Sequence, residues 1–249
     1  MIRPLALLVF LLALAACASG PENRYIDPPD ELYREAHESL DEGNYMRAET
    51  VLKDIMSHYP FTDYSVQAHL DVLYVLLQLD RPEELAEEAD RFIRENPRHP
   101  KIDYAYYMKG LGFFEALTNP VRELLDLDVA RQDIENAKTA FRNFSQLVSR
   151  FPDSEYSGDA RLRMIALKKR IARHHIYIAS HYMRQGAWIS ALQNAFHVLK
   201  EFQGTPAEID ALMVMVRSYE ALGLDELAET PRRILAANPD REAAVLKRN

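Results

Sequence analysis

The sequence predicts an all-α protein, an α-solenoid of five stacked helix pairs and therefore of ten helices. Three observations lead to this fold class. From Asp30 onward the apolar residues follow helical spacing, and the alternation typical of strands is hard to find. An alanine is repeatedly followed by a proline eleven or twelve residues later, and the pattern Pro-x-x-acid-Tyr-small also recurs. The chain therefore contains a repeated unit.

Both patterns mark the junction between one helix pair and the next. The first joins Ala48 to Pro60, Ala86 to Pro97, Ala140 to Pro152 and Ala228 to Pro239, and Ala191 to Gln203 keeps the spacing without the proline. The second gives Asp63-Tyr64-Ser65, Asp103-Tyr104-Ala105 and Glu155-Tyr156-Ser157. Proline ends a helix, an acid stabilises the first turn of the next, and alanine lets two helices cross closely. These are tetratricopeptide positions.

The repeats place the helix pairs at about 30–60, 62–97, 101–152, 153–203 and 206–239. In the first and fourth pairs, Gly43 and Gly186 end one helix, and Tyr45 and Trp188 open the next. The second and fifth pairs share the sequence Glu-Leu-Ala-Glu, at 84–87 and 226–229, where we expect their two helices to cross.

The third pair exceeds the usual period, because a loop at 118–131 is inserted between its helices. The fourth begins with a helix at 154–185 that should extend past its partner. We divide the body into N-terminal repeats 1–2 (30–97), repeat 3 with its loop (98–152), C-terminal repeats 4–5 (153–241) and a tail (242–249).

The N-terminus has the form of a secretory signal. A short cationic start precedes a twelve-residue apolar run, Leu5 to Ala16, which is too short to span a bilayer. Leu14-Ala-Ala-Cys17 resembles a bacterial lipobox, and Cys17 is the only cysteine. We expect a signal peptide at 1–16, N-acyl and S-diacylglycerol lipid on Cys17, and an extended tether at 17–29. The alternative is an ordinary signal peptide with an incidental cysteine.

Composition and motifs favour a protein without catalytic activity, metal or further cofactor. A formal net charge of −8 disfavours nucleic-acid binding. No phosphate loop, nucleophile motif or zinc motif is found. His174 and His175 point about 100° apart on a helix, and His181 lies two turns from His174, so they do not form one metal site.

Two helical faces are candidate binding surfaces. In the first helix of the second pair, Val66, Leu70, Leu73 and Leu77 form the apolar stripe. A second face, which could hold an extended precursor segment, carries Tyr64, Gln67, Asp71, Tyr74 and Gln78. The alternative is a solvated face whose tyrosines pack against neighbours.

The long opening helix of the fourth pair is basic within an acidic chain. The candidate contacts to an acidic partner subunit are Arg163, Lys168, Arg170, His174 and, at the start of the next helix, Trp188. A solvated face with internal ion pairs is one alternative, anionic lipid head groups are another, and Trp188 could instead be a core residue.

Several sequence segments are more specific than the general tetratricopeptide pattern. They are Leu14-Ala-Ala-Cys17, Tyr59-Pro-Phe-Thr-Asp-Tyr-Ser65, Asp90-Arg-Phe-Ile-Arg94, Asn96-Pro-Arg-His-Pro100, Asp103-Tyr-Ala-Tyr-Tyr-Met-Lys-Gly110, Phe151-Pro-Asp-Ser154, Arg184-Gln-Gly-Ala-Trp188 and Thr205-Pro-Ala-Glu-Ile-Asp-Ala211. Through them nearly the whole chain resembles the BamD family, lipoprotein subunits of the bacterial outer-membrane β-barrel assembly machinery. Phe202-Gln203-Gly204 and the absence of Asp-Pro near Asp133 depart from the family pattern.

The resemblance implies a scaffold anchored at the periplasmic face of the outer membrane. Its implied partners are the periplasmic domains of the barrel subunit, accessory lipoproteins of the complex and unfolded outer-membrane protein precursors. Ala18 after the cysteine favours sorting to the outer membrane. The rival hypotheses are a tetratricopeptide lipoprotein that organises pilus or peptidoglycan structures, and an enzyme accessory or hydrolase with an unrecognised site.

Overall fold

A computed structural model describes residues 27–117 and 129–239. Cys17, the expected signal peptide, most of the expected tether, residues 118–128 of the expected loop and the expected tail lie outside the described residues. No helix in the described part is both long and apolar enough to cross a membrane.

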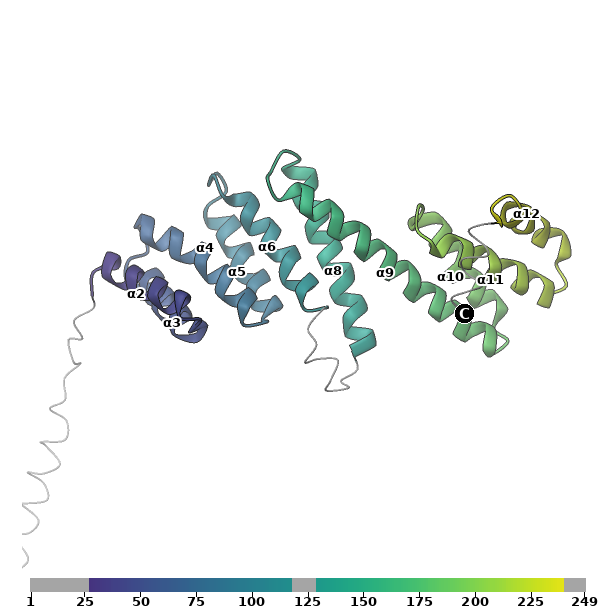
Figure 1. The fold of residues 1–249 in the computed structure, drawn as a ribbon, viewed down its shortest axis with the longest axis horizontal. Coiled ribbons are helices and arrows are strands. Elements are labelled where there is room, and N and C mark those ends of the chain that lie inside the picture. The colour runs from purple at the N-terminus through teal and green to yellow at the C-terminus, as the bar shows by residue number, and fades with distance from the viewer. Residues whose placement is uncertain (1–26, 118–128, 240–249) are drawn as a thin grey trace, which may run out of the picture.

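The described residues form ten α-helices and no strand, which confirms the predicted fold class. In chain order the helices are α2 (Pro29–Asp41), α3 (Tyr45–His58), α4 (Asp63–Gln78), α5 (Pro82–Glu95), α6 (Ile102–Glu115), α8 (Val129–Arg150), α9 (Ser157–Arg184), α10 (Trp188–Glu201), α11 (Ala207–Ala221) and α12 (Asp225–Ala236). Each packs against the next, so the molecule is an elongated row of helix pairs (Figure 1).

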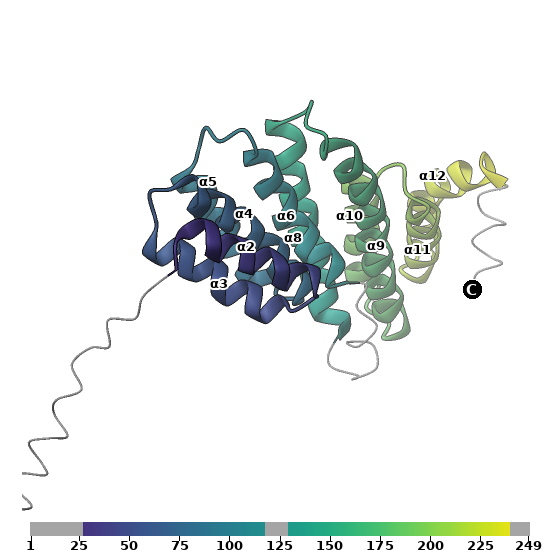
Figure 2. The ribbon, with the colours of Figure 1, turned by 60° about the vertical axis from the view of Figure 1, so that its left-hand side comes forward.

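Helices that open successive pairs also contact one another. Besides neighbours in sequence, the contacts are between α2 and α4, α4 and α6, α6 and α9, and α9 and α11. Figure 2 shows α9 and α11 side by side at one end of this series. The opening helices therefore share one face of the solenoid, as is typical of tetratricopeptide arrays.

The turns explain where the helices end. Gly43 and Gly186 have φ values of 71° and 72°, a left-handed conformation that glycine adopts without steric cost. In the second pair Asp80 takes the corresponding conformation, with a φ of 54°. Asn44 and Thr62 cap α3 and α4 by accepting hydrogen bonds from backbone N–H groups.

Small residues permit close helix crossings. Four of the repeat alanines, Ala48, Ala140, Ala191 and Ala228, are fully buried. In the second pair Ala86 is only partly buried, and Ala89 is the fully buried residue. At the crossing of α6 with α8, a Cβ on Gly110 would lie 2.5 Å from the buried ring of Phe144, so only glycine fits without a shift.

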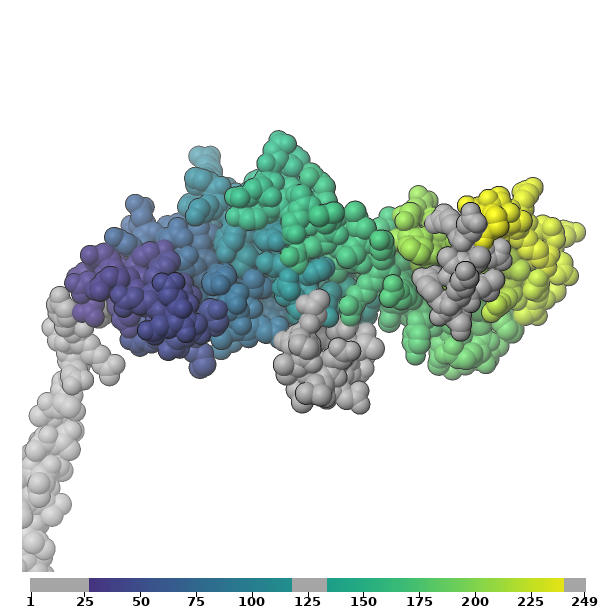
Figure 3. All heavy atoms as spheres, in the orientation of Figure 1, coloured from purple at the N-terminus to yellow at the C-terminus, as the bar shows by residue number. Residues whose placement is uncertain are grey.

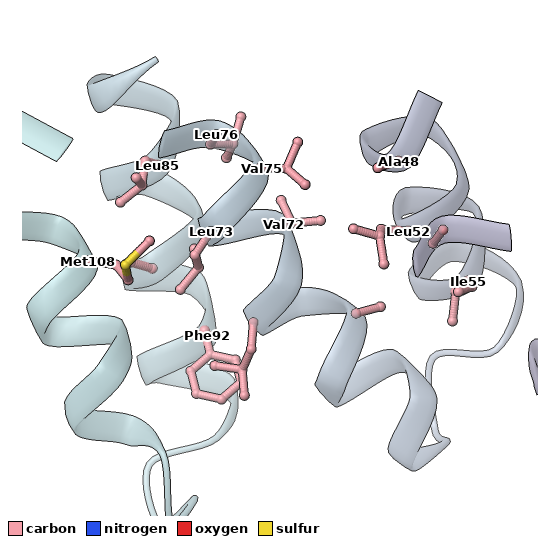
Figure 4. Packing of buried hydrophobic residues seen from close by; sticks show 14 of the residues in the cluster. Ala48, Leu52, Ile55, Val72, Leu73, Val75, Leu76, Leu85, Phe92 and Met108 are labelled. Carbon is pink, nitrogen blue, oxygen red and sulfur yellow. The ribbon is translucent and has the colours of Figure 1, made fainter. Parts of the chain in front are cut away.

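The core is continuous along the N-terminal repeats. Figure 4 shows side chains from successive helices meeting between the layers: Ala48, Leu52 and Ile55 of α3, Val72, Leu73, Val75 and Leu76 of α4, Leu85 and Phe92 of α5, and Met108 of α6. Burial of these apolar side chains stabilises each helix against its neighbours.

Helix α9 joins the two halves of the molecule. Its residues Leu167 and Ile171 pack in a cluster with α8, whereas Ala172 and Ala179 belong to the cluster of α10 and α11. With 28 residues against 14 in α10, it extends past its partner as expected. It begins at Ser157, three residues later than expected, because Ser154 lies in a turn and bonds to Asp103. Helix α8 begins at Val129, so residues 129–131 of the expected loop are helical.

Candidate functional site

Tyrosines from several repeats meet on the face formed by the opening helices. We call this the tyrosine surface; its members are Tyr33 of α2, Tyr64 and Tyr74 of α4, Tyr104 and Tyr107 of α6, and Tyr156 just before α9. Ring centroids lie 5.6 Å apart for Tyr33 and Tyr64, and 4.8 Å apart for Tyr107 and Tyr156. Tyr156 also lies 5.8 Å from Tyr104. The surface thus crosses four helix pairs.

Asp71 organises the N-terminal part of this surface. Its carboxylate accepts a hydrogen bond from the Tyr33 hydroxyl at 2.8 Å and from the Gln67 amide at 3.1 Å, and it lies 3.2 Å from His37 Nε2. Burial raises the pKa of Tyr33, and the adjacent Asp71 carboxylate raises it further. Burial is also the larger cause of the raised pKa of Tyr104, and the charge of Asp71 adds to it. Both phenols therefore remain protonated at neutral pH.

A hollow of about 560 Å³ opens beside this cluster. It is lined by Tyr33, Asp63, Tyr64, Val66, Gln67, Asn96 and His99. Its walls combine aromatic rings with hydroxyl, amide and carboxylate groups, so it presents both apolar surface and hydrogen-bonding atoms to a ligand.

The structure places four of the five predicted precursor-binding residues together. Tyr64, Gln67, Asp71 and Tyr74 share the face toward α2 and α6. Tyr64 packs on Tyr33, and Tyr74 packs on Tyr45 of α3 at 6.4 Å between ring centroids. Both keep about two fifths of their surface exposed, at 39% and 41%. Gln78 is exposed at the end of α4 and does not join the cluster.

Arg163 lies at the junction of α6 and α9. It bonds to Asp159 at 2.6 Å and to Glu115 at 2.8 Å, and it stacks over the Phe114 ring. Asp159 also accepts from the Tyr107 hydroxyl at 2.7 Å. Burial opposes ionisation of Asp159, but the bonds from Tyr107 and Arg163 outweigh it and lower its pKa. Burial and the Asp159 bond raise the pKa of Tyr107 to about 12. Arg163 thus has intramolecular partners.

The other predicted subunit contacts are dispersed. Lys168 lies on a different side of α9 from Arg163. It donates a hydrogen bond to the Gln203 carbonyl at 2.8 Å, which connects α9 to the turn before α11. Arg170 is exposed. His174 is half-buried, and burial, followed by the nearby Lys138, lowers its pKa. Trp188 is half-buried at the start of α10. The structure does not bring the five into one cluster.

Sequence reasoning missed Tyr33, Tyr104, Tyr107 and Tyr156 as parts of the surface. A signal was available, because Tyr64, Tyr104 and Tyr156 are the tyrosines of the repeated Pro-x-x-acid-Tyr-small pattern. It also missed a ring contact of 4.4 Å between His175 and His197. Within the described residues, no group of three or more His, Cys, Asp or Glu is placed to hold a metal ion.

The stacked pairs define a tetratricopeptide-like repeat protein whose opening helices carry an aromatic, hydrogen-bonding face. The family model described as "YfiO: Outer membrane lipoprotein" matches residues 26–234. The chain belongs to this family, which confirms the resemblance to the BamD family.

The relatives are named outer membrane protein assembly factor BamD. That of Vibrio cholerae is 34% identical over 93% of this chain and 96% of its own. The Haemophilus influenzae protein is 32% identical over 99% of this chain and 94% of its own. The protein of Neisseria meningitidis serogroup A is 31% identical over 91% of this chain and 87% of its own. Among solved structures, a tetratricopeptide repeat protein from Parabacteroides merdae is 16% identical, with a TM-score of 0.32, over 88% of this chain and 97% of its own.

Proposed function

We propose that the protein is a lipid-anchored, non-enzymatic scaffold of an outer-membrane β-barrel assembly complex, at the periplasmic face. It binds the periplasmic domains of the barrel subunit and unfolded outer-membrane protein precursors, alongside accessory lipoproteins. The names of its relatives support a role in outer-membrane protein assembly. The tyrosine surface is the observation in the molecule that carries the proposal.

The chemistry of the tyrosine surface suits an extended polypeptide. An unfolded precursor offers unpaired backbone N–H and C=O groups and, in a strand destined for a barrel, alternating apolar side chains. Phenol rings bury apolar side chains, while their hydroxyls and the neighbouring Gln67 and Asp71 bond to polar groups. The rings are partly fixed by their contacts with one another, so less conformational entropy is lost when a segment binds.

For the barrel subunit, the proposed contacts are on α9 and the start of α10. Arg170 and His174 lie on one side of α9, with Arg170 exposed and His174 half-buried, and Trp188 adds an aromatic contact. Arg163 and Lys168 support this surface indirectly, through their bonds to Glu115 and to Gln203. An acidic patch on a periplasmic domain complements these cations.

Site-specific crosslinking in cells tests both contacts. A photoreactive residue at Tyr74 should capture unfolded barrel precursors, and one at Arg170 should capture a large barrel protein with periplasmic domains. Met46 and Lys200 are exposed on the second helices α3 and α10 and serve as controls. Equal crosslinking from the controls, or capture of pilus components or murein fragments, would contradict the proposal.

A further inference from the structure

Positive charge is concentrated on one helix of an acidic protein. The chain has a formal net charge of −8, yet α9 holds a single acidic residue, Asp159. The same helix contains seven Lys and Arg residues, which are Arg161, Arg163, Lys168, Lys169, Arg170, Arg173 and Arg184. Such segregation of charge on a surface favours an anionic partner there.

One set of exposed residues runs in a line along α9. We call this the α9 strip; its members are Leu162, Ala166, Lys169, Arg173, Tyr177 and Arg184, spaced by four, three, four, four and seven residues. This spacing keeps them on one side of a helix. Leu162 and Tyr177 are 68% and 66% exposed. Lys169, Arg173 and Arg184 make no hydrogen bond or ion pair with the described part of the chain.

The α9 strip lies on the same face of the solenoid as the tyrosine surface. On one flank, Asp159 bonds to Tyr107 of α6. On the other flank, Ile176, Ser180 and Met183 line a hollow of about 190 Å³ with residues of α11. Helices α6 and α11 both open pairs, so the strip lies on the face that these helices share. Figure 3 shows α9 reaching the molecular surface between the two halves.

We propose that the α9 strip is a separate docking site for an extended, acidic polypeptide segment. Consecutive members Lys169, Arg173 and Tyr177 are about 6 Å apart along the helix axis, four residues at 1.5 Å each. Alternate residues of an extended strand are about 6.6 Å apart and point the same way. The matching segment is therefore acid-x-acid-x-aromatic, with the acids on Lys169 and Arg173 and the aromatic residue beside Tyr177.

The line of cations is narrow and lies between α6 and α11. This shape favours a polypeptide segment over a lipid surface, because a flat membrane would also contact α6 and α11. The α9 strip goes beyond the proposed function, because it includes neither the tyrosine surface, nor the lipid anchor, nor the proposed barrel-subunit contacts Arg170 and His174. Its failure would leave the proposed function standing.

Fluorescence anisotropy of a labelled peptide tests the proposal. The probe is an extended serine-rich peptide carrying Glu-Ser-Glu-Ser-Phe, and its partner has both Glu replaced by Gln. The full chain in detergent is titrated at about 10 mM salt, where the screening length is roughly 30 Å. The Glu peptide should bind more tightly than the Gln peptide. Lys169→Glu with Arg173→Glu should weaken its binding by roughly tenfold or more.

The control carries the same charge change elsewhere. Lys200→Glu with Arg98→Glu replaces exposed cations outside α9 and should leave peptide binding within about twofold of the wild type. Lys169→Gln with Arg173→Gln should give an intermediate loss, and thermal melts should show that all variants fold. Equal binding of both peptides, or unchanged binding by the α9 variants, would overturn the proposal. So would binding of phosphatidylglycerol vesicles, but not the peptide, that depends on Lys169 and Arg173.

Discussion

At the scale of single residues, a few polar side chains connect the repeats and set the chemistry of the exposed face. Asp71 accepts hydrogen bonds from Tyr33 of α2 and from Gln67 of α4. Asp159 accepts hydrogen bonds from Tyr107 of α6 and from Arg163 of α9. Hydrogen bonds to a charged acceptor contribute more than neutral ones, and removing a shared acceptor leaves several donors without a partner. Such acceptors are the sensitive points of the surface.

We expect Asp71→Asn to destabilise the N-terminal repeats and alter their tyrosines. The amide keeps the size of the carboxylate but offers one acceptor oxygen and no charge, so the free energy of unfolding should fall by about 1–2 kcal/mol. Because Asp71 contributes to the raised pKa of Tyr33 and of Tyr104, these two phenols should ionise at lower pH in the variant. Urea unfolding and ultraviolet titration measure these effects. Asp54→Asn, on the exposed side of α3, should change neither.

Glu88 should give the protein an acid-sensitive stability. His69 Nε2 lies 3.0 Å from the backbone carbonyl of Glu88 and 3.1 Å from its carboxylate, and Arg91 lies 2.8 Å from the carboxylate. The polar contact with His69 outweighs burial and, together with the Arg91 charge, lowers the pKa of Glu88 from the ordinary 4.5. A lowered folded pKa contributes stability above pH 4.5, and this stability is lost as the pH falls through the lower folded value.

Glu88→Gln removes that contribution. The variant should be less stable than the wild type at pH 7, and the difference should shrink as the pH is lowered below 4.5. Denaturation midpoints across this range measure it. The neighbouring, exposed Glu87→Gln should follow the wild type. A constant difference at every pH would show that Glu88 acts through packing alone.

At the scale of helices, packing distance decides which residues are tolerated. Helices α6 and α8 approach so closely at Gly110 that an added methyl group would overlap the Phe144 ring. Overpacking of a buried site costs about 1–3 kcal/mol, more than the roughly 1 kcal/mol that alanine gains over glycine in a helix.

Gly110→Ala should therefore lower the melting temperature by several degrees, as measured by circular dichroism. Gly158→Ala is the matched control. No side chain lies within 4 Å of a Cβ built there, and the residue is helical, so this variant should be neutral or stabilised by up to about 1 kcal/mol. Equal melting temperatures for the two variants would mean that Phe144 moves away without cost.

At the scale of the whole molecule, local spacing predicted the row of helices well, because each junction carries its own proline, glycine or acid. It also predicted that Tyr64, Gln67, Asp71 and Tyr74 share a face. It could not predict that Asp71 bonds to Tyr33, which is 38 residues away, because that contact depends on how neighbouring pairs stack.

The same limit explains the outcome for Arg163. Contact with an acidic partner and an internal ion pair were both left open for its charge, and Glu115, 48 residues earlier, pairs with it. Helical periodicity shows which side of α9 carries a charge, but it does not show which residue of α6 lies opposite. The unpaired Lys169 and Arg173 became visible only from the described contacts.

The lipid anchor is a prediction about the entire chain. Cys17→Ser should yield a folded protein that no longer fractionates with membranes, because the thiol that would be acylated is gone. Circular dichroism checks the fold, and fractionation of cells checks the location. Unchanged membrane retention would remove the lipid tether from the account.

Affinity capture from solubilised outer membranes tests the central claim most directly. The wild-type chain should recover a large barrel protein with periplasmic domains together with unfolded barrel precursors. A variant with Tyr64→Ala and Tyr74→Ala should lose the precursors but keep the barrel protein. Recovery of pilus secretion components or murein fragments in place of the barrel protein would contradict a role in barrel assembly.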